Sequence, residues 1–215
     1  MSAQKSSSGF TLIELLVVIA IVGLISVFTL PAVNSFGQAR GVTEAAYQVA
    51  AAVELARSEA ITRQTFVWLG LQPQINYGNL DLRIGLVYSK DGSSTNTAPS
   101  NLQPIGRSVL LQGVGLVPPD AVVPASSPPP VDLSKFSGGI SFANGQMTNT
   151  DKRSLTFTPM GEVTANGSPG TTGGFDPRLG IGLRQTRGTA LGSNVNNDIA
   201  VVIDGSVGIP AIYRK

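Results

Sequence analysis

The stretch GFTLIELL at residues 9–16 begins an apolar run that continues to Leu30, and Glu14 is the one charged residue within that run. As a helix, residues 10–30 would be about 30 Å long, which matches the hydrocarbon thickness of a bilayer. A carboxylate in such a segment costs about 2.5–3.5 kcal/mol on insertion scales and indicates a functional residue with a partner. The run therefore predicts a membrane-spanning helix in which Glu14 does more than anchor.

The composition excludes several classes of enzyme. The 215 residues include no His and no Cys, which removes Cys nucleophiles, Ser-His-Asp triads and the usual zinc sites. The charged fraction of 13% is about half that of ordinary soluble domains, roughly 25%. We therefore expect no catalysis, no cofactor and no metal. The net charge of +2 gives only weak support for nucleic-acid binding.

The residues before the apolar run are polar and carry one Lys, Lys5. A short basic leader favours a cytoplasmic amino terminus and a body on the outer side of the membrane. A cleaved secretory signal would have an apolar core of about 7–15 residues, shorter than this run. A plain signal anchor would explain the length of the run but not Glu14.

The motif GFTLIE resembles the prepilin processing motif of type IV pilins and type II secretion pseudopilins. The resemblance implies that a membrane prepilin peptidase cuts between Gly9 and Phe10 and methylates the new amine of Phe10. Glu14 could then pair with that amine, in its own chain or in a neighbour, and so favour the correct axial register between subunits. The alternative is that Glu14 extends to the headgroups, since it lies close to the end of the helix.

Helical patterning resumes beyond Pro31, which removes one backbone hydrogen bond and favours a kink. Apolar residues recur at spacings of three and four and predict one narrow apolar face: Val42, Ala46, Val49, Val53, Ala56 and Ala60. We expect one helix over about residues 10–63, bent near Pro31. Its last part, AAVELARSEAITR at residues 51–63, resembles the helix end of minor pseudopilins of the H type and of minor pilins of the FimT kind.

From residue 65 onward the periodicity changes to that of short strands, bounded by Gly, Pro, Asn or Asp. The predicted strands are residues 65–71, 82–88, 108–111, 139–142, 154–158, 181–187, 199–203 and 207–213, and the predicted loops are 89–104, 118–130, 165–177 and 188–198. LTFTPMG at 155–161 and IAVVIDGSV at 199–207 resemble the strand-turn and the closing hairpin of the same minor-pseudopilin family.

Two candidate binding features in the body are weak. The loop DGSSTN at residues 91–96 lacks the spaced carboxylates and closing Glu of an EF-hand, so a solvated turn is the better interpretation. DNA-uptake relatives use basic residues near the carboxy terminus. Here Arg184, Arg187, Arg214 and Lys215 could serve, but the Gly-Arg turn that the family often has is replaced by Gly205-Ser206.

Together these patterns predict an α+β, pilin-like fold in which a long N-terminal helix, transmembrane in its first half and bent near Pro31, packs on a C-terminal antiparallel β-sheet domain. The expected parts are a leader (1–9), an assembly helix (10–31), an amphipathic helix (32–64) and a β-rich body (65–215).

The expected function is that of a minor pilin or pseudopilin, held in the inner membrane with its body in the periplasm and assembled into a filament. The resemblance implies three partners: other pilin-like subunits, the prepilin peptidase and an inner-membrane assembly platform. A DNA-binding minor pilin of the FimT kind is the alternative.

Overall fold

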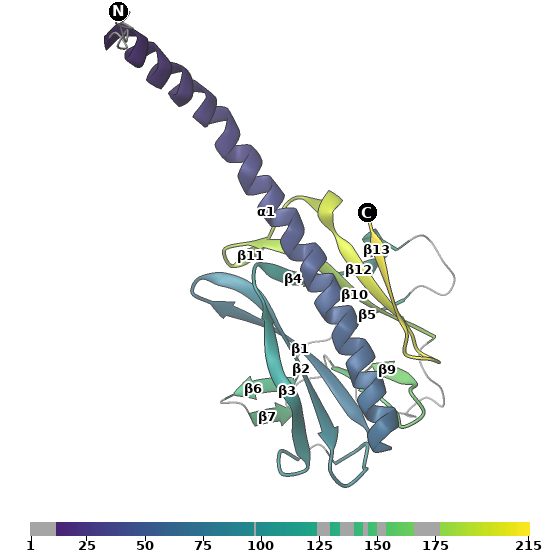
Figure 1. The fold of residues 1–215 in the computed structure, drawn as a ribbon. Coiled ribbons are helices and arrows are strands. Elements are labelled where there is room, and N and C mark those ends of the chain that lie inside the picture. Colours follow the sequence, from purple (N-terminus) through teal and green to yellow (C-terminus); the bar gives the residue numbers. More distant parts are fainter. Residues whose placement is uncertain are drawn as a thin grey trace, which may run out of the picture. The chain divides into compact units, whose positions relative to one another are not determined.

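The computed structural model of the protein describes residues 12–96, 98–123, 130–133, 140–143, 146–149, 154–165 and 177–215. For residues 27–40, 121, 140–143 and 146–149 it describes the backbone alone. The chain divides into two compact units, Met1–Gln38 and Ala39–Lys215. One helix, α1 (Leu12–Arg63), contributes residues to both units (Figure 1).

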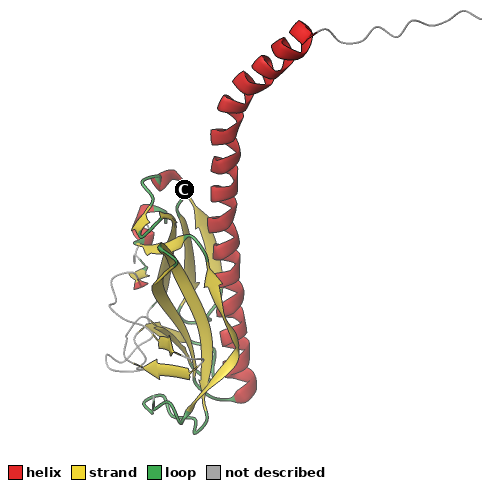
Figure 2. Cartoon of the chain, turned by 90° about the vertical axis from the view of Figure 1, so that its left-hand side faces the viewer, coloured by secondary structure: helices red, strands yellow, loops and turns green. Residues whose placement is uncertain are grey.

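The second part of α1 buries the narrow apolar face that the sequence predicts. Its six members recur at helical spacing and are each at most 1% exposed: Val42, Ala46, Val49, Val53, Ala56 and Ala60. Three of the six are alanine, so little side-chain bulk separates the helix backbone from the strands that it covers. Figure 2 shows this part of α1 running along one side of the strands.

The end of α1 is closed by backbone hydrogen bonds. The amide of Gln64 donates to the carbonyl of Ile61 at 3.3 Å, and the amide of Thr65 donates to that of Ala60 at 3.2 Å. This pair of bonds, with Gln64 in the left-handed conformation at φ 53°, is a Schellman motif. Helix and first strand are therefore joined by a tight, fully bonded corner.

The first sheet has five strands in the order β3-β2-β1-β8-β9, all antiparallel. Its strands are β1 (Val67–Asn76), β2 (Asn79–Ser89), β3 (Leu102–Leu111), β8 (Ser154–Phe157) and β9 (Val163–Ala165). Since β3 and β9 pair on one side only, they form the two edges of this sheet.

The second sheet is built around β10, which pairs with four other strands. Its strands are β4 (Val114–Val117), β5 (Val131–Asp132), β10 (Arg178–Arg187), β11 (Ala190–Leu191), β12 (Ile199–Asp204) and β13 (Pro210–Arg214). Only the short β5 pairs in parallel with β10. The described part of the chain also holds a two-stranded ladder, β6 (Ile140–Ala143) with β7 (Gln146–Asn149), and two 3-10 turns, η1 (Pro119–Ala121) and η3 (Val195–Asn197).

One hydrophobic core joins α1 to both sheets. Leu69 and Phe157 enter it from the first sheet and Ile181 and Val201 from the second, and all four are 0% exposed. Burying such a side chain stabilises the fold by about 1.5–3 kcal/mol relative to leaving it in water. The predicted α+β fold class, with a long helix packed on an antiparallel domain, is confirmed. The bend near Pro31 stays a prediction.

Strand β12 is apolar at every position from Ile199 to Ile203 because both of its faces are covered. Ile199, Val201 and Ile203 face the main core. The intervening Ala200 and Val202 pack in a second cluster with Val122 and Val123, which follow η1. A run without alternation is typical of a strand buried on two sides.

Several sequence-based boundaries are wrong. Strand β3 begins at Leu102, inside the predicted loop 89–104, and runs on through the predicted strand 108–111. Its Gln103 and Arg107 face solvent, and an edge strand with such polar positions gives a weak apolar signal. The predicted loop 188–198 contains β11 and η3. In the predicted loops 118–130 and 165–177, residues 124–129 and 166–176 lie outside the described residues.

The last hairpin has a longer turn than the sequence predicts, because β13 begins at Pro210 rather than at residue 207. The carboxylate of Asp204 accepts a hydrogen bond from the amide of Ser206 at 2.9 Å. The amide of Gly208 donates to the carbonyl of Asp204 at 2.7 Å. The hydrogen bonds from Ser206 lower the pKa of Asp204 and hold the turn as a five-residue loop.

Two glycine substitutions should change stability in opposite directions. A Cβ on Gly182 would lie 2.2 Å from the carbonyl oxygen of Val117, its partner in β4, whereas a Cβ on Gly41 of α1 meets no described atom within 4 Å. We expect Gly182→Ala to lower the free energy of unfolding by roughly 1–3 kcal/mol. Gly41→Ala should raise it by roughly 1 kcal/mol through helix propensity. Urea unfolding measures both, and equal effects would contradict the close contact at Gly182.

Candidate functional site

The amino-terminal part of α1 presents a largely apolar surface. All side chains described there, from Leu12 to Ser26, are exposed, and Leu12, Ile13 and Leu24 are each more than 65% exposed. Within its own unit, this segment therefore has no described core against which to bury these side chains. Among the described residues we find no helical stretch whose length and hydropathy together suffice to cross a bilayer.

Of the four predicted processing and assembly residues, only Glu14 has a described side chain. It lies in the first turn of α1, where the helix dipole favours a negative charge. Gly9 and Phe10 lie outside the described residues, and Pro31 lies within α1 with its backbone alone described. The pairing of Glu14 with the Phe10 amine therefore stays a prediction.

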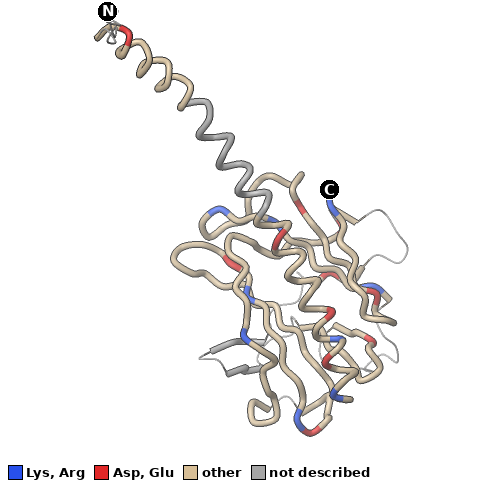
Figure 3. The backbone as a smooth tube through the Cα atoms, in the orientation of Figure 1, with Lys and Arg blue, Asp and Glu red and all other residues tan. Residues whose placement is uncertain are grey.

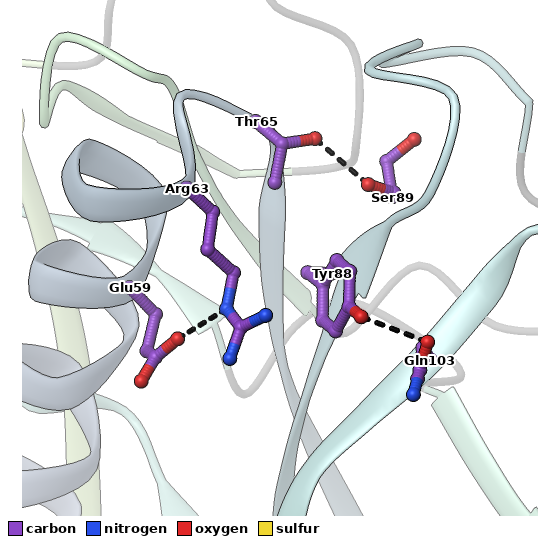
Figure 4. Close-up of polar contacts among 6 residues, drawn as sticks. All are labelled: Glu59, Arg63, Thr65, Tyr88, Ser89 and Gln103. Atoms are coloured by element: carbon purple, nitrogen blue, oxygen red, sulfur yellow. Dashed lines mark hydrogen bonds and ion pairs between the residues drawn. The ribbon is translucent and has the colours of Figure 1, made fainter.

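Polar contacts fix the carboxy-terminal end of α1 to the first sheet (Figure 4). Arg63 forms an ion pair with Glu59 at 2.5 Å, and its guanidinium lies 4.5 Å from the centre of the Tyr88 ring. The hydrogen bond that Arg63 donates to Glu59 raises the pKa of Arg63. The Tyr88 hydroxyl donates to Gln103 of β3 at 2.8 Å, so the contacts continue from the helix across β2 to the sheet edge.

The loop at residues 91–96 is organised around the carboxylate of Asp91. That carboxylate accepts hydrogen bonds from the amide of Ser93 at 2.9 Å and the side chains of Ser89 at 2.8 Å, Asn96 at 2.6 Å and Asn101 at 2.8 Å. These donors, with the Ser93 amide first, hold the pKa of Asp91 well below its usual range. The carboxylate oxygens thus close a turn. Within the described residues, no group of three or more acidic, His or Cys side chains could hold a metal ion.

Two of the four basic residues considered for DNA contact bond within the body. Arg184 forms a double hydrogen bond to Asp198, at 2.7 Å from Nε and 2.6 Å from Nη2, and Asp198 is 0% exposed. Arg214 donates to the hydroxyl of Thr43 on α1 at 2.8 Å. Figure 3 shows the Lys and Arg residues of the described body scattered over the surface instead of gathered in one patch.

A groove runs between α1 and the edge of the first sheet, and the sequence did not reveal it. It encloses about 460 Å³, and we call it the α1–β3 groove. Its lining is mostly aliphatic: Gln48, Ala51, Ala52 and Leu55 of α1, Ile84, Gly85 and Leu86 of β2, and Ile105, Gly106, Arg107 and Val109 of β3. The available signal was the position of Leu55 outside the Ala-rich face of the helix; it is 44% exposed.

Comparison with known protein families gives two matches. A family model described as the prokaryotic N-terminal methylation motif matches residues 4–30. A second, described as type II transport protein GspH, matches residues 45–192, which is more than half of the chain. Comparisons with curated proteins and with solved structures gave no match.

The hydrogen bonds to Asp91 should make the free energy of unfolding depend on pH in the acidic range. Because the pKa of Asp91 is lowered by folding, its contribution is fully present above the unfolded pKa, about 4, and is lost as the pH falls toward the folded pKa. We expect the free energy of unfolding, measured in urea, to fall less steeply between pH 5 and pH 2.5 in Asp91→Asn than in the unmodified chain. Asp120→Asn, at an exposed carboxylate, is the matched control and should keep the original slope. Equal slopes for all three chains would contradict the role of Asp91.

Proposed function

Because this chain belongs to the GspH family of type II transport proteins, we propose that it is a minor pseudopilin that is processed after Gly9 and assembled through α1 into a type II secretion pseudopilus. The observation that carries the proposal is the order of the two family matches along the chain. The methylation motif covers residues 4–30, and the GspH match begins at residue 45, so both include part of α1. A processing signal and a pseudopilin body thus share one helix.

In the proposed processing step, the peptidase cuts between Gly9 and Phe10 and methylates the Phe10 amine. The cut leaves the apolar run in the mature chain and creates a positive charge four residues before Glu14. In a low-dielectric surrounding, a carboxylate and an ammonium group attract strongly. Pairing of Glu14 with the Phe10 amine of a neighbouring subunit would reward one axial register and disfavour a slipped one.

We further propose that residues 10–31 span the inner membrane once, with the body in the periplasm. The exposed apolar side chains between Leu12 and Ser26 support this placement, because transfer of apolar surface from water into lipid is favourable. In the proposed role Pro31 marks the place where the helix bends as it leaves the bilayer. The partners would be the peptidase, an assembly platform in the same membrane and other pseudopilins.

In this proposal the protein acts as a structural subunit that polymerises and does not catalyse a reaction. The absence of His and Cys from the whole sequence and the hydrogen-bonded state of the Asp91 carboxylate support this view. The alternative of a DNA-binding minor pilin draws little support from the basic residues near the carboxy terminus. Arg184 neutralises a buried carboxylate and Arg214 bonds to α1, so neither guanidinium is fully available to a phosphate.

Intact mass should reveal the proposed processing. We expect the chain purified from native membranes to lack residues 1–9 and to carry one added methyl group on Phe10. Tandem fragmentation would place the methyl group. A Gly9→Val chain, which removes the small residue before the cut, is the control and should keep its leader. An intact leader on the unmodified chain in membranes that contain the peptidase would refute the proposal.

A substitution at Glu14 should separate insertion from assembly. We expect Glu14→Ala to leave the chain in the membrane fraction, since it removes a charge from an apolar run, but to lower its incorporation into filaments severalfold. Glu54→Ala, at an exposed Glu of α1 in the body, is the matched control and should incorporate normally. Sheared filaments analysed by immunoblot give the readout. Normal incorporation of Glu14→Ala would rule out the register mechanism.

A further inference from the structure

The α1–β3 groove has the dimensions and the lining of a site for another helix. On one wall Ala51 and Ala52 leave the α1 backbone accessible, and on the floor Gly85 adds no side chain. Small residues in such positions allow a second backbone to approach closely. Leu55 and Val109 stand at opposite walls and are each 44% exposed, so apolar surface remains open to solvent.

The groove continues toward the start of the body. A second, more polar hollow is lined by Gly41, Glu44 and Gln48 of α1 and by residues 110–112 of the chain, and it shares Gln48 with the α1–β3 groove. The stretch of α1 from Gly41 to Leu55 is about 21 Å long at 1.5 Å per residue. The open surface is therefore long enough for roughly four turns of a partner helix.

The edge strand β3 is poorly suited to bind an extended partner. The backbone amide of Lys90 donates to the carbonyl of Asn101. Hydrogen-bonded and non-hydrogen-bonded pairs alternate along an antiparallel ladder, so the pair of Val87 with Pro104 is non-hydrogen-bonded and the backbone of Pro104 points away from β2. Proline has no amide proton to offer to an added strand. At Gly106, with φ 69°, the strand bulges: the register moves from Ile84–Val109 to Leu86–Ile105. Bulges and prolines are devices that block edge pairing.

The positive charge of Arg107 in the groove favours a partner that carries a negative charge. Arg107 on β3 is the charged residue that lines the groove, while Gln48 donates to Glu44 at 3.0 Å on the α1 side. An apolar stripe flanked by a carboxylate would match both the aliphatic lining and Arg107. A lipid chain would match the lining alone.

We propose that the α1–β3 groove receives an α-helix of a neighbouring filament subunit, with the apolar stripe of that helix over Ala51 and Leu55 and one of its carboxylates against Arg107. The helix lies beside α1 and covers the part of the first sheet that α1 leaves open. The inference rests on the proposed function, since it takes the neighbour to be another pseudopilin. It adds the surface and the type of element that binds there.

Photo-crosslinking in native membranes tests the groove, because the chain has no Cys and a single introduced one is unique. Leu55→Cys, labelled with a benzophenone maleimide in the full-length chain, should crosslink to helical peptides of another subunit at positions three or four residues apart. Tyr77→Cys, at a turn residue that is 97% exposed, is the matched control and should not give that pattern. Crosslinks only to strands, to loops or to lipid, or none to protein, would overturn the inference.

Charge reversal gives a second, independent readout. Arg107→Glu should lower the Leu55 crosslink yield at least fivefold, and exchange of the crosslinked partner's nearest carboxylate for Lys should restore it. Arg187→Glu, at an exposed residue of β10, should leave the yield unchanged. An unchanged yield in Arg107→Glu would remove the charge pairing from the proposal. If the leader is removed and the chain enters filaments while no helix is crosslinked, the groove inference fails and the proposed function stands.

Discussion

Everything in the body depends on the contact between the Ala-rich face of α1 and the two sheets. The face has little side-chain bulk, so the helix lies close to strands of both sheets and closes their shared core. A large residue at Ala46, Ala56 or Ala60 would separate the helix from the strands that it covers. The close fit also explains why β12 can be apolar throughout: one face of it meets this core and the other meets the residues after η1.

The same close approach leaves the first sheet only partly covered. The helix is narrow along its Ala-rich face, while the sheet extends beyond it through β2 to β3. Ile84 and Leu86 are buried at the floor of the resulting groove, but Val109 at its rim is not. The contacts among Glu59, Arg63, Tyr88 and Gln103 hold the last turns of the helix to the first sheet. The α1–β3 groove is thus a consequence of the narrow contact between α1 and the first sheet.

The sequence predicts the helix best, since six apolar residues at a spacing of three and four have one simple solution, and all six are buried. Apolar strands such as β12 were equally clear. Edge elements were not: β3 combines Pro104, Gly106 and solvent-facing polar residues, and its partner strand supplies the pairing that local sequence does not show. The motif around Gly9, Phe10 and Glu14 could be recognised from the sequence alone. The groove was not, because it joins residues of α1 to residues of β2 and β3 that are distant in the sequence.

The closed end of α1 has a mechanical consequence. The Schellman corner at Gln64 and the hydrogen bond from Thr65 to the carbonyl of Ser89 fix the last turn to the first sheet. The buried face extends from Val42 to Ala60, parallel to the helix axis. A force applied along that axis loads all of these contacts at once, in shear, while a sideways force would break them one after another. A subunit of this design resists axial thrust far better than it resists peeling.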